Sequence, residues 1–210
     1  MTIIRQLIHR AAYNTKIHFG IFATVLIVLT LIMTLSYYPL CPGQDFHFHF
    51  QRFNALIQAF LDRTFPYYID SGALAGYGYF TKTFYSDFVL IPFALIGYFT
   101  NDVTGYLSMI FTMTVLCGIF TYHTINVIYK SSYAAAIGSI LYTFAIYRLL
   151  DLYHRAALGE ALSFTFVPIV ILGLYYIIKG DYRKWYVLAI GFSLMIFTHV
   201  LSSLLLFLLY

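Results

Sequence analysis

Long uncharged apolar runs alternate with short polar segments along this chain. The first run covers residues 17–40 and contains no Asp, Glu, Lys or Arg. Four further runs of this kind follow at residues 103–129, 131–147, 161–178 and 185–210. A helix needs about 17–25 mainly apolar residues to cross the hydrocarbon core of a bilayer. The pattern therefore predicts an all-α polytopic transmembrane bundle with five crossings.

A shorter apolar stretch at residues 88–100 decides the predicted topology. Runs of about 10–14 apolar residues are more often re-entrant or interfacial than spanning. If this stretch does not span, the predicted cytoplasmic side holds seven of the twelve Lys and Arg residues. If it spans, the cytoplasmic side holds only five of them. Because basic residues collect in cytoplasmic loops, we predict a cytoplasmic N-terminus and two extracytoplasmic loops, residues 41–102 and 148–160.

The composition excludes most other classes of protein. The chain is 61% hydrophobic and 10% charged, with a mean hydropathy of +0.81, which leaves too little polar surface for a soluble domain of this size. The net charge of +4 does not require nucleic acid as a partner, since basic membrane loops explain it. The last residues are apolar without a polar flank, so we expect residues 1–210 to be one N-terminal membrane domain of a longer chain.

The large first loop begins with an apolar stripe at helical spacing, which predicts an amphipathic helix from after Gly43 to about Arg63. The stripe consists of Phe46, Phe50, Phe53, Ile57 and Phe60. A strand is the alternative, because Phe alternates with polar residues from Asp45 to Phe50, and it would place Asp45, His47 and His49 on one face as a metal-ligand set. The irregular pattern that follows favours the helix.

Asp45, His49 and Arg52 recur at i, i+4 and i+7 and would share one edge of that helix. The simpler interpretation is an N-cap at Asp45 followed by a solvated interfacial face. From the spacing alone this interpretation outweighs a catalytic one, because structural ion pairs also gather at such places.

Two further polar segments contain candidate binding residues. Tyr77 and Tyr79 alternate with glycines, so their rings could stack on a sugar, although a tyrosine-rich interfacial loop explains either residue more simply. In the second loop Asp151 and Arg155 are spaced i, i+4 and could simply pair. We interpret His199, near the end of an apolar run, as a packed and hydrogen-bonded residue.

At these residues the chain resembles a family of bacterial multi-pass membrane proteins labelled "6-pyruvoyl-tetrahydropterin synthase-related membrane domain". That family is similar in layout to the GT-C glycosyltransferase superfamily, which includes oligosaccharyltransferases and protein mannosyltransferases. The resemblance covers residues 17 to about 210. It rests on Gly43, Asp45, His49, Arg52, Pro66-Tyr67, residues 76–79, Phe84-Tyr85 and the Tyr-Arg-x-x-Asp-x-Tyr-x-Arg-Ala-x-x-Gly-Glu motif that ends at Glu160.

The resemblance implies a GT-C-like fold and a catalytic carboxylate in the first outer loop, a role that falls on Asp45. A second acidic residue, Glu160 or Asp151, would come from the second outer loop. Many relatives have two adjacent acidic residues in the first loop, whereas this chain has Gln44 before Asp45. That departure leaves open the alternative that this chain is a non-catalytic relative of the family.

The leading hypothesis is therefore a glycosyltransferase at the outer face of the cell membrane, with membrane lipid and a lipid-linked sugar donor as partners. Asp45 would act as general base on the acceptor, and Arg155, with Arg52 or Arg148, would neutralise the phosphate of a polyprenyl-phosphate donor. His49 would orient Asp45 or hold the phosphate, and Asp45 and Glu160 could share a divalent cation. The alternative is a non-catalytic protein that binds, flips or scaffolds cell-envelope lipids.

Overall fold

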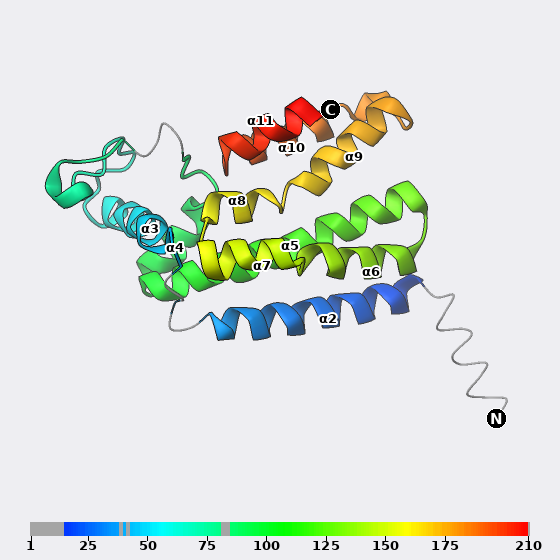
Figure 1. Cartoon of the computed structure of the whole chain (residues 1–210), viewed down its shortest axis with the longest axis horizontal. Coiled ribbons are helices and arrows are strands. Elements are labelled where there is room, and N and C mark those ends of the chain that lie inside the picture. The colour runs from blue at the N-terminus through cyan, green and yellow to red at the C-terminus, as the bar shows by residue number, and fades with distance from the viewer. Residues whose placement is uncertain (1–14, 38–39, 41–42, 81–84, 210) are drawn as a thin grey trace.

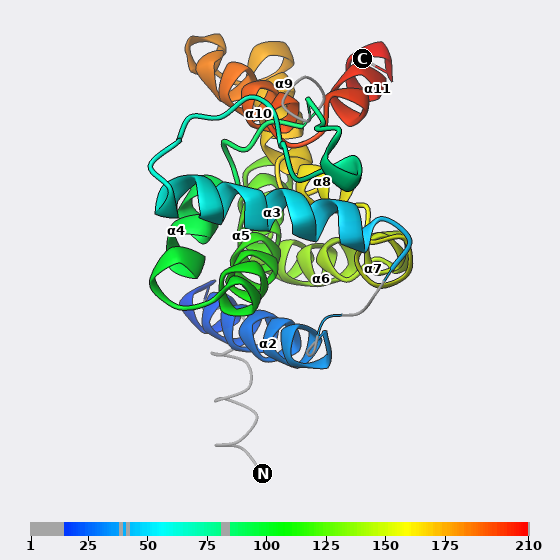
Figure 2. The same ribbon diagram turned by 90° about the vertical axis from the view of Figure 1, so that its left-hand side faces the viewer.

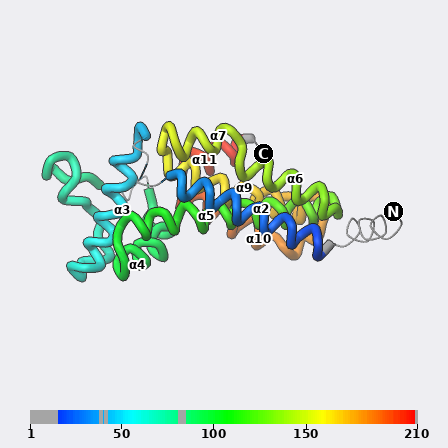
Figure 3. The backbone as a smooth tube through the Cα atoms, turned by 90° about the horizontal axis from the view of Figure 1, so that it is seen from below, coloured from blue at the N-terminus to red at the C-terminus, as the bar shows by residue number. Residues whose placement is uncertain are grey.

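The computed structural model describes residues 15–37, 40, 43–80 and 85–209. It is an elongated bundle in which α2 (Thr15–Ser36), α5 (Asp102–Tyr129) and α6 (Ser132–Thr143) lie side by side (Figures 1 and 3). Within the described residues there are no strands, and the only β-type pairing is an isolated bridge between Asp70 and Tyr79. The all-helical prediction is confirmed.

Three helices are long and apolar enough to cross a membrane: Lys16–Ser36, Asp102–Tyr129 and Ser132–Arg155. The third is not uniform. After α6 the chain continues in α7 (Ile146–Leu150) and then widens into a π-helical turn, η3 (Asp151–Arg155). These three helices indicate a membrane protein, and they correspond to the first three predicted spans.

The last two predicted spans are divided helices, so the fourth and fifth crossings stay a prediction. The first divides into α8 (Leu158–Ser163) and α9 (Val167–Ile178), and the second into α10 (Tyr186–Ile196) and α11 (Val200–Leu209), which follow the short turn η4 (Tyr182–Lys184). Proline near the start of α9 lacks the N–H group needed to continue a helix. The pattern of apolar and polar residues along the sequence does not show where such breaks fall.

Side-chain hydroxyls donate hydrogen bonds to backbone carbonyls at both breaks. The Tyr142 hydroxyl donates to the Phe164 carbonyl at 3.0 Å, and the Thr198 hydroxyl donates to the Met195 carbonyl at 2.8 Å. Broken helices are tolerated in membrane proteins where side chains satisfy the freed backbone groups in this way.

The predicted amphipathic helix of the first loop is α3 (Phe46–Leu61), which lies across one end of the bundle (Figure 2). The strand alternative is wrong. The apolar stripe faces inward, and Phe53, which has no exposed surface, packs its ring edge-on against Tyr106 of α5 with ring centres 5.6 Å apart. The neighbouring α4 (Ile91–Phe99) has nine residues, about 14 Å of helix, which is too short to span a bilayer alone.

Two backbone hydrogen bonds tie the start of α3 to the second polar segment. The amide of Gln44 donates to the His154 carbonyl at 3.0 Å, and the amide of Asp45 donates to the Arg155 carbonyl at 2.8 Å. Glycine is required beside them, because a Cβ on Gly43 would lie 2.6 Å from the Ala156 Cβ. The two predicted loops therefore meet at one end of the molecule.

Candidate functional site

The junction of these two segments contains a pocket of about 290 Å³. It is formed by the start of α3, Tyr85, the turn before α8, and α11. Its polar lining consists of Asp45, His49, Tyr85, Arg155, Glu160, His199 and Ser202, and its apolar lining includes Ala157, Leu201 and Leu205. Residues from both predicted loops thus share one cavity.

Local backbone geometry directs the acidic and basic side chains of the second segment toward one another. The π-helical turn ends at Ala156, which adopts a left-handed conformation with φ of 52°. This conformation is unusual for a residue with a Cβ, and it redirects the chain so that α8 begins at a new angle. π-Helical turns occur often at functional sites.

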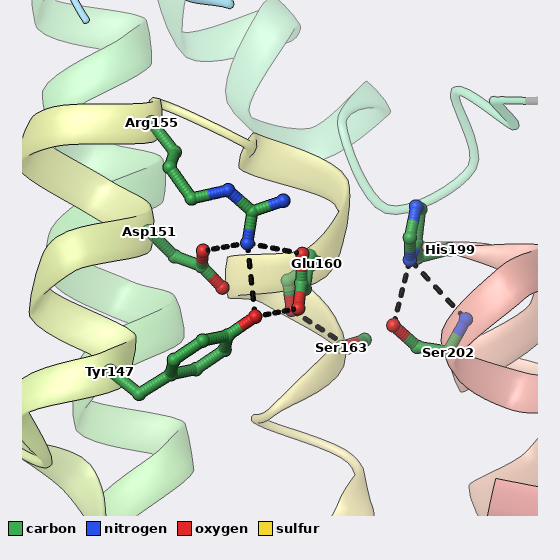
Figure 4. Close-up of polar contacts among 7 residues, drawn as sticks. All are labelled: Tyr147, Asp151, Arg155, Glu160, Ser163, His199 and Ser202. Atoms are coloured by element: carbon green, nitrogen blue, oxygen red, sulfur yellow. Dashed lines mark hydrogen bonds and ion pairs between the residues drawn. The ribbon is translucent and has the colours of Figure 1, made fainter. Parts of the chain in front are cut away.

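Arg155 is the centre of the resulting network (Figure 4). Its Nη1 atom lies 2.6 Å from Asp151 Oδ1 and 2.9 Å from Glu160 Oε2, and it donates to the Tyr147 hydroxyl at 3.0 Å. The Tyr147 hydroxyl in turn donates to Glu160 Oε1 at 2.8 Å. The pairing of Asp151 with Arg155 that the spacing suggested is therefore present.

One side of the Arg155 guanidinium stays available. All three protein contacts fall on Nη1, so within the described residues Nε and Nη2 have no partner, and the side chain is 41% exposed. A guanidinium offers its donors as a planar fork, which suits phosphate or carboxylate oxygens. This arrangement can hold an anionic group of a ligand.

Asp45 and Glu160 differ in whether their carboxylate oxygens already have partners in the protein. Glu160 is held by Arg155 and Tyr147 through both of its oxygens. Asp45 occupies the N-cap position of α3, but its carboxylate makes no capping hydrogen bond, and it is exposed at the pocket. Among the carboxylates that line this pocket, Asp45 is therefore the one free to accept a proton from a ligand.

His49 does not lie on a solvated face, so the simpler interpretation of the polar edge is wrong for this residue. It is 2% exposed, and its ring packs edge-on against Tyr85 at 5.3 Å. Burial, with smaller contributions from Arg52 and His199, lowers the pKa of His49 to about 3. The imidazole is therefore uncharged at neutral pH. It can donate or accept a hydrogen bond with a ligand, but it contributes no charge to the pocket.

The structure adds three residues that the sequence argument did not place in a site. Tyr85 was named only as part of the Phe84-Tyr85 pair in the family resemblance, and Ser202 was not assigned any role. His199 was expected to be a packing residue, yet it lines the pocket while its Nδ1 atom lies 2.7 Å from the Ser202 hydroxyl (Figure 4). The one available signal was a Thr-His pair that interrupts an otherwise apolar run.

Four of the predicted binding residues do not line this pocket. Arg148 is 2% exposed and donates to the Thr143 carbonyl and to the Thr114 hydroxyl, each at 3.0 Å, so it joins helices inside the bundle. Tyr77 is 92% exposed. Arg52 and Tyr79 line a separate cavity.

The described residues do not form a metal centre. No three His, Cys, Asp or Glu side chains of the described segments come together as a possible ligand group, so Asp45, His47 and His49 are not a metal-ligand set. Asp45 and Glu160 line the same pocket, but Glu160 is already engaged, and the residues present do not fit a protein-held divalent ion. Residues Cys41, Lys82 and Phe84, which also lie in the first loop, fall outside the described residues.

Comparisons with protein-family models, with curated proteins and with solved structures found no match.

Proposed function

We propose that this protein is a membrane glycosyltransferase, which moves a sugar from a polyprenyl-phosphate-linked donor to a cell-envelope acceptor. The observation that carries the proposal is the composition of the pocket between the two polar segments. A free carboxylate, a guanidinium with two unused nitrogens and an apolar wall line one cavity.

The apolar wall supports a ligand with a lipid tail. Leu201 and Leu205 of α11 line the pocket, and each is 63% exposed. In a membrane these side chains face hydrocarbon, so a polyprenyl chain can lie against them while the phosphate and sugar reach Arg155 and Asp45. A soluble sugar nucleotide would gain nothing from such a wall.

Each polar group of the pocket has one role in the proposed reaction. Asp45 accepts the proton of the acceptor hydroxyl as its oxygen bonds to the anomeric carbon. The bond between that carbon and the phosphate oxygen breaks, and the electron pair leaves with the polyprenyl phosphate. Arg155 donates hydrogen bonds from Nε and Nη2 to the leaving phosphate, and Glu160 and Asp151 position the guanidinium.

The two carboxylates of Asp151 and Glu160 already more than offset the single positive charge of Arg155. The contribution of this arginine is therefore directional hydrogen bonding more than net positive charge. An ammonium group cannot reproduce the planar fork, so Arg155→Lys is expected to lose much of the activity while keeping the charge.

We extend the proposal to five crossings with a cytoplasmic N-terminus and an extracytoplasmic site. The meeting of the two polar segments at one end of the bundle supports this topology, because a membrane separates segments on opposite sides. The broken pairs α8–α9 and α10–α11 supply the fourth and fifth crossings.

The direct test measures release of polyprenyl phosphate from a lipid-linked sugar donor by the purified chain, supplied with a panel of acceptor sugars. Asp45→Asn is expected to lower turnover by roughly 10²–10⁴-fold, because the amide keeps the shape of the side chain and removes its basicity. Asp62→Asn is the matched control, since Asp62 is exposed at the other end of the same helix.

Equal turnover in Asp45→Asn and wild type would remove Asp45 from the mechanism. Binding of the lipid donor by the wild-type chain without any turnover would favour the non-catalytic alternative, a protein that binds, flips or scaffolds envelope lipids.

A further inference from the structure

A second cavity of about 500 Å³ lies between α3 and the segment of residues 70–79. Small-molecule sites usually have volumes of roughly 300–1,000 Å³. The polar lining residues are His47, Gln51, Arg52, Asp70 and Tyr79, and Phe48 contributes an aromatic wall. Neither the proposed base nor Arg155 belongs to this cavity.

Arg52 is the unusual residue of the cavity. Its side chain is 3% exposed, and within the described residues its Nε and Nη1 atoms have no hydrogen-bond partner. The nearest carboxylate oxygen, Asp87 Oδ1, is 4.0 Å from Nε, beyond hydrogen-bonding distance. Burial lowers the pKa of Arg52 only to about 10, so the side chain stays charged at neutral pH. Buried donors are rarely left unsatisfied in native proteins, so an incompletely paired, buried guanidinium in the lining of this cavity points to a polar ligand.

Asp70 supplies an acceptor on the opposite wall of the cavity. It is 8% exposed, and its Oδ1 accepts a hydrogen bond from the Gly72 amide at 3.1 Å. Two backbone hydrogen bonds of 3.0 Å between Asp70 and Tyr79 close this segment. Gly78, with φ of 80°, allows the tight turn that brings Tyr79 back over α3.

The charges and rings of the cavity favour an uncharged ligand rich in hydroxyl groups. Asp70 and Asp87 offset the charge of Arg52, so there is no surplus positive charge to attract an anion. Gln51 and His47 add groups that both donate and accept. The rings of Phe48 and Tyr79 lie edge-on with centres 6.0 Å apart and offer apolar faces to the C–H side of a sugar ring.

We propose that this cavity binds a neutral sugar unit of the acceptor, with Arg52 donating to its hydroxyl groups and Asp70 accepting from them. The inference rests on the proposed transferase function and names the acceptor as a glycan. The guanidinium of Arg52 lies 5.0 Å above the ring of Tyr85, and that ring also contacts His49 of the first pocket. The ring of Tyr85 thus lies between the first pocket and this cavity, so an acceptor glycan bound in the cavity is next to the pocket that holds Asp45.

The test is ligand-observed NMR with the purified chain in detergent micelles, using methyl mannoside, methyl glucoside, methyl glucuronoside and inorganic phosphate as probes. The neutral glycosides are expected to bind the wild type, and Arg52→Gln and Asp70→Asn are expected to weaken that binding about tenfold or more. Gln51→Ala is expected to weaken it by a smaller factor and keeps the proposal testable if the buried variants do not fold, because Gln51 is exposed. Arg155→Gln, which alters only the first pocket, is expected to leave glycoside binding unchanged.

Three results would overturn the inference: no binding of either neutral glycoside, binding that all the cavity variants leave unchanged, or binding of the glucuronoside and phosphate alone. The readout is binding, so it separates this inference from the proposed function. Glycoside binding without donor turnover would contradict only the transferase proposal, and donor turnover without glycoside binding in this cavity would contradict only the inference.

Discussion

Arg148 and Arg155 lie seven residues apart and show how burial decides what a guanidinium does. Arg148 is inside the bundle, where its donors join α5 to the end of α6. Arg155 is part-exposed and has two nitrogens left for a ligand. Both residues belong to the same polar segment, and their spacing in the sequence does not distinguish them.

The buried His49 makes a prediction about pH. Its pKa is lowered from 6.5 to about 3, so between these values the unfolded chain binds a proton that the folded chain does not. Stability is therefore lost as pH falls from about 6.5, by about 1.4 kcal/mol per pH unit at most. We expect the apparent unfolding temperature to fall less between about pH 7 and pH 5 in His49→Gln than in the wild type.

The measurement is thermal unfolding followed by circular dichroism in detergent. His47→Gln is the control for removal of a histidine from the same helix, because His47 is exposed. The same pH dependence in His49→Gln and the wild type would contradict the assignment of a neutral, buried His49.

At the scale of elements, the position of α3 depends on the close approach of two backbones. Gly43 has room for no side chain, because an added Cβ would lie 2.6 Å from the Ala156 Cβ and 2.8 Å from the His154 carbonyl oxygen. The adjacent amides of Gln44 and Asp45 make the hydrogen bonds that hold α3 against the second segment. The placement of Asp45 beside Arg155 therefore depends on a glycine two residues before it.

Gly43→Ala is expected to destabilise the protein by about 1–3 kcal/mol, the usual cost of overpacking, and to lower donor turnover by displacing Asp45. Gly20→Ala in α2 is the matched control, because nothing lies within 4 Å of its added Cβ and alanine favours a helix over glycine by roughly 1 kcal/mol. Thermal unfolding and polyprenyl-phosphate release would be compared for both variants. A Gly43→Ala protein as stable and active as Gly20→Ala would show that the contact does not hold the site together.

At the scale of the whole molecule, the proposed topology places the pocket end of the bundle outside the cell. Single cysteines introduced at Ser131, Asp181 and His154 in a cysteine-free background test this arrangement. We expect a membrane-impermeant thiol reagent to label His154→Cys in intact cells and to leave the other two unlabelled until the membrane is permeabilised. His154 and Asp181 are exposed and Ser131 is half-buried, so all three positions can react once the reagent reaches them. Labelling at Ser131 and not at His154 would reverse the topology.

The sequence by itself determined the class of protein, the helix that begins the first loop and two of the segments that form the pocket. These properties follow from local patterns: the length of an apolar run relates to bilayer thickness, and the spacing of Phe46, Phe53 and their neighbours defines one face of a helix. The candidate residues Asp45, His49, Arg155 and Glu160 were found in the same way, because polar groups beside apolar runs stand out.

Only the tertiary structure decided how those residues are used. The breaks at residues 164–166 and 197–199 depend on hydroxyl groups that reach backbone carbonyls, as Tyr142 does from α6. The separation of Arg52 and Arg155 into two cavities depends on which neighbours bury each guanidinium. His199 enters the pocket because α11 packs against α8. Burial and contacts between distant segments are properties of the packed chain, and a single sequence records them only indirectly.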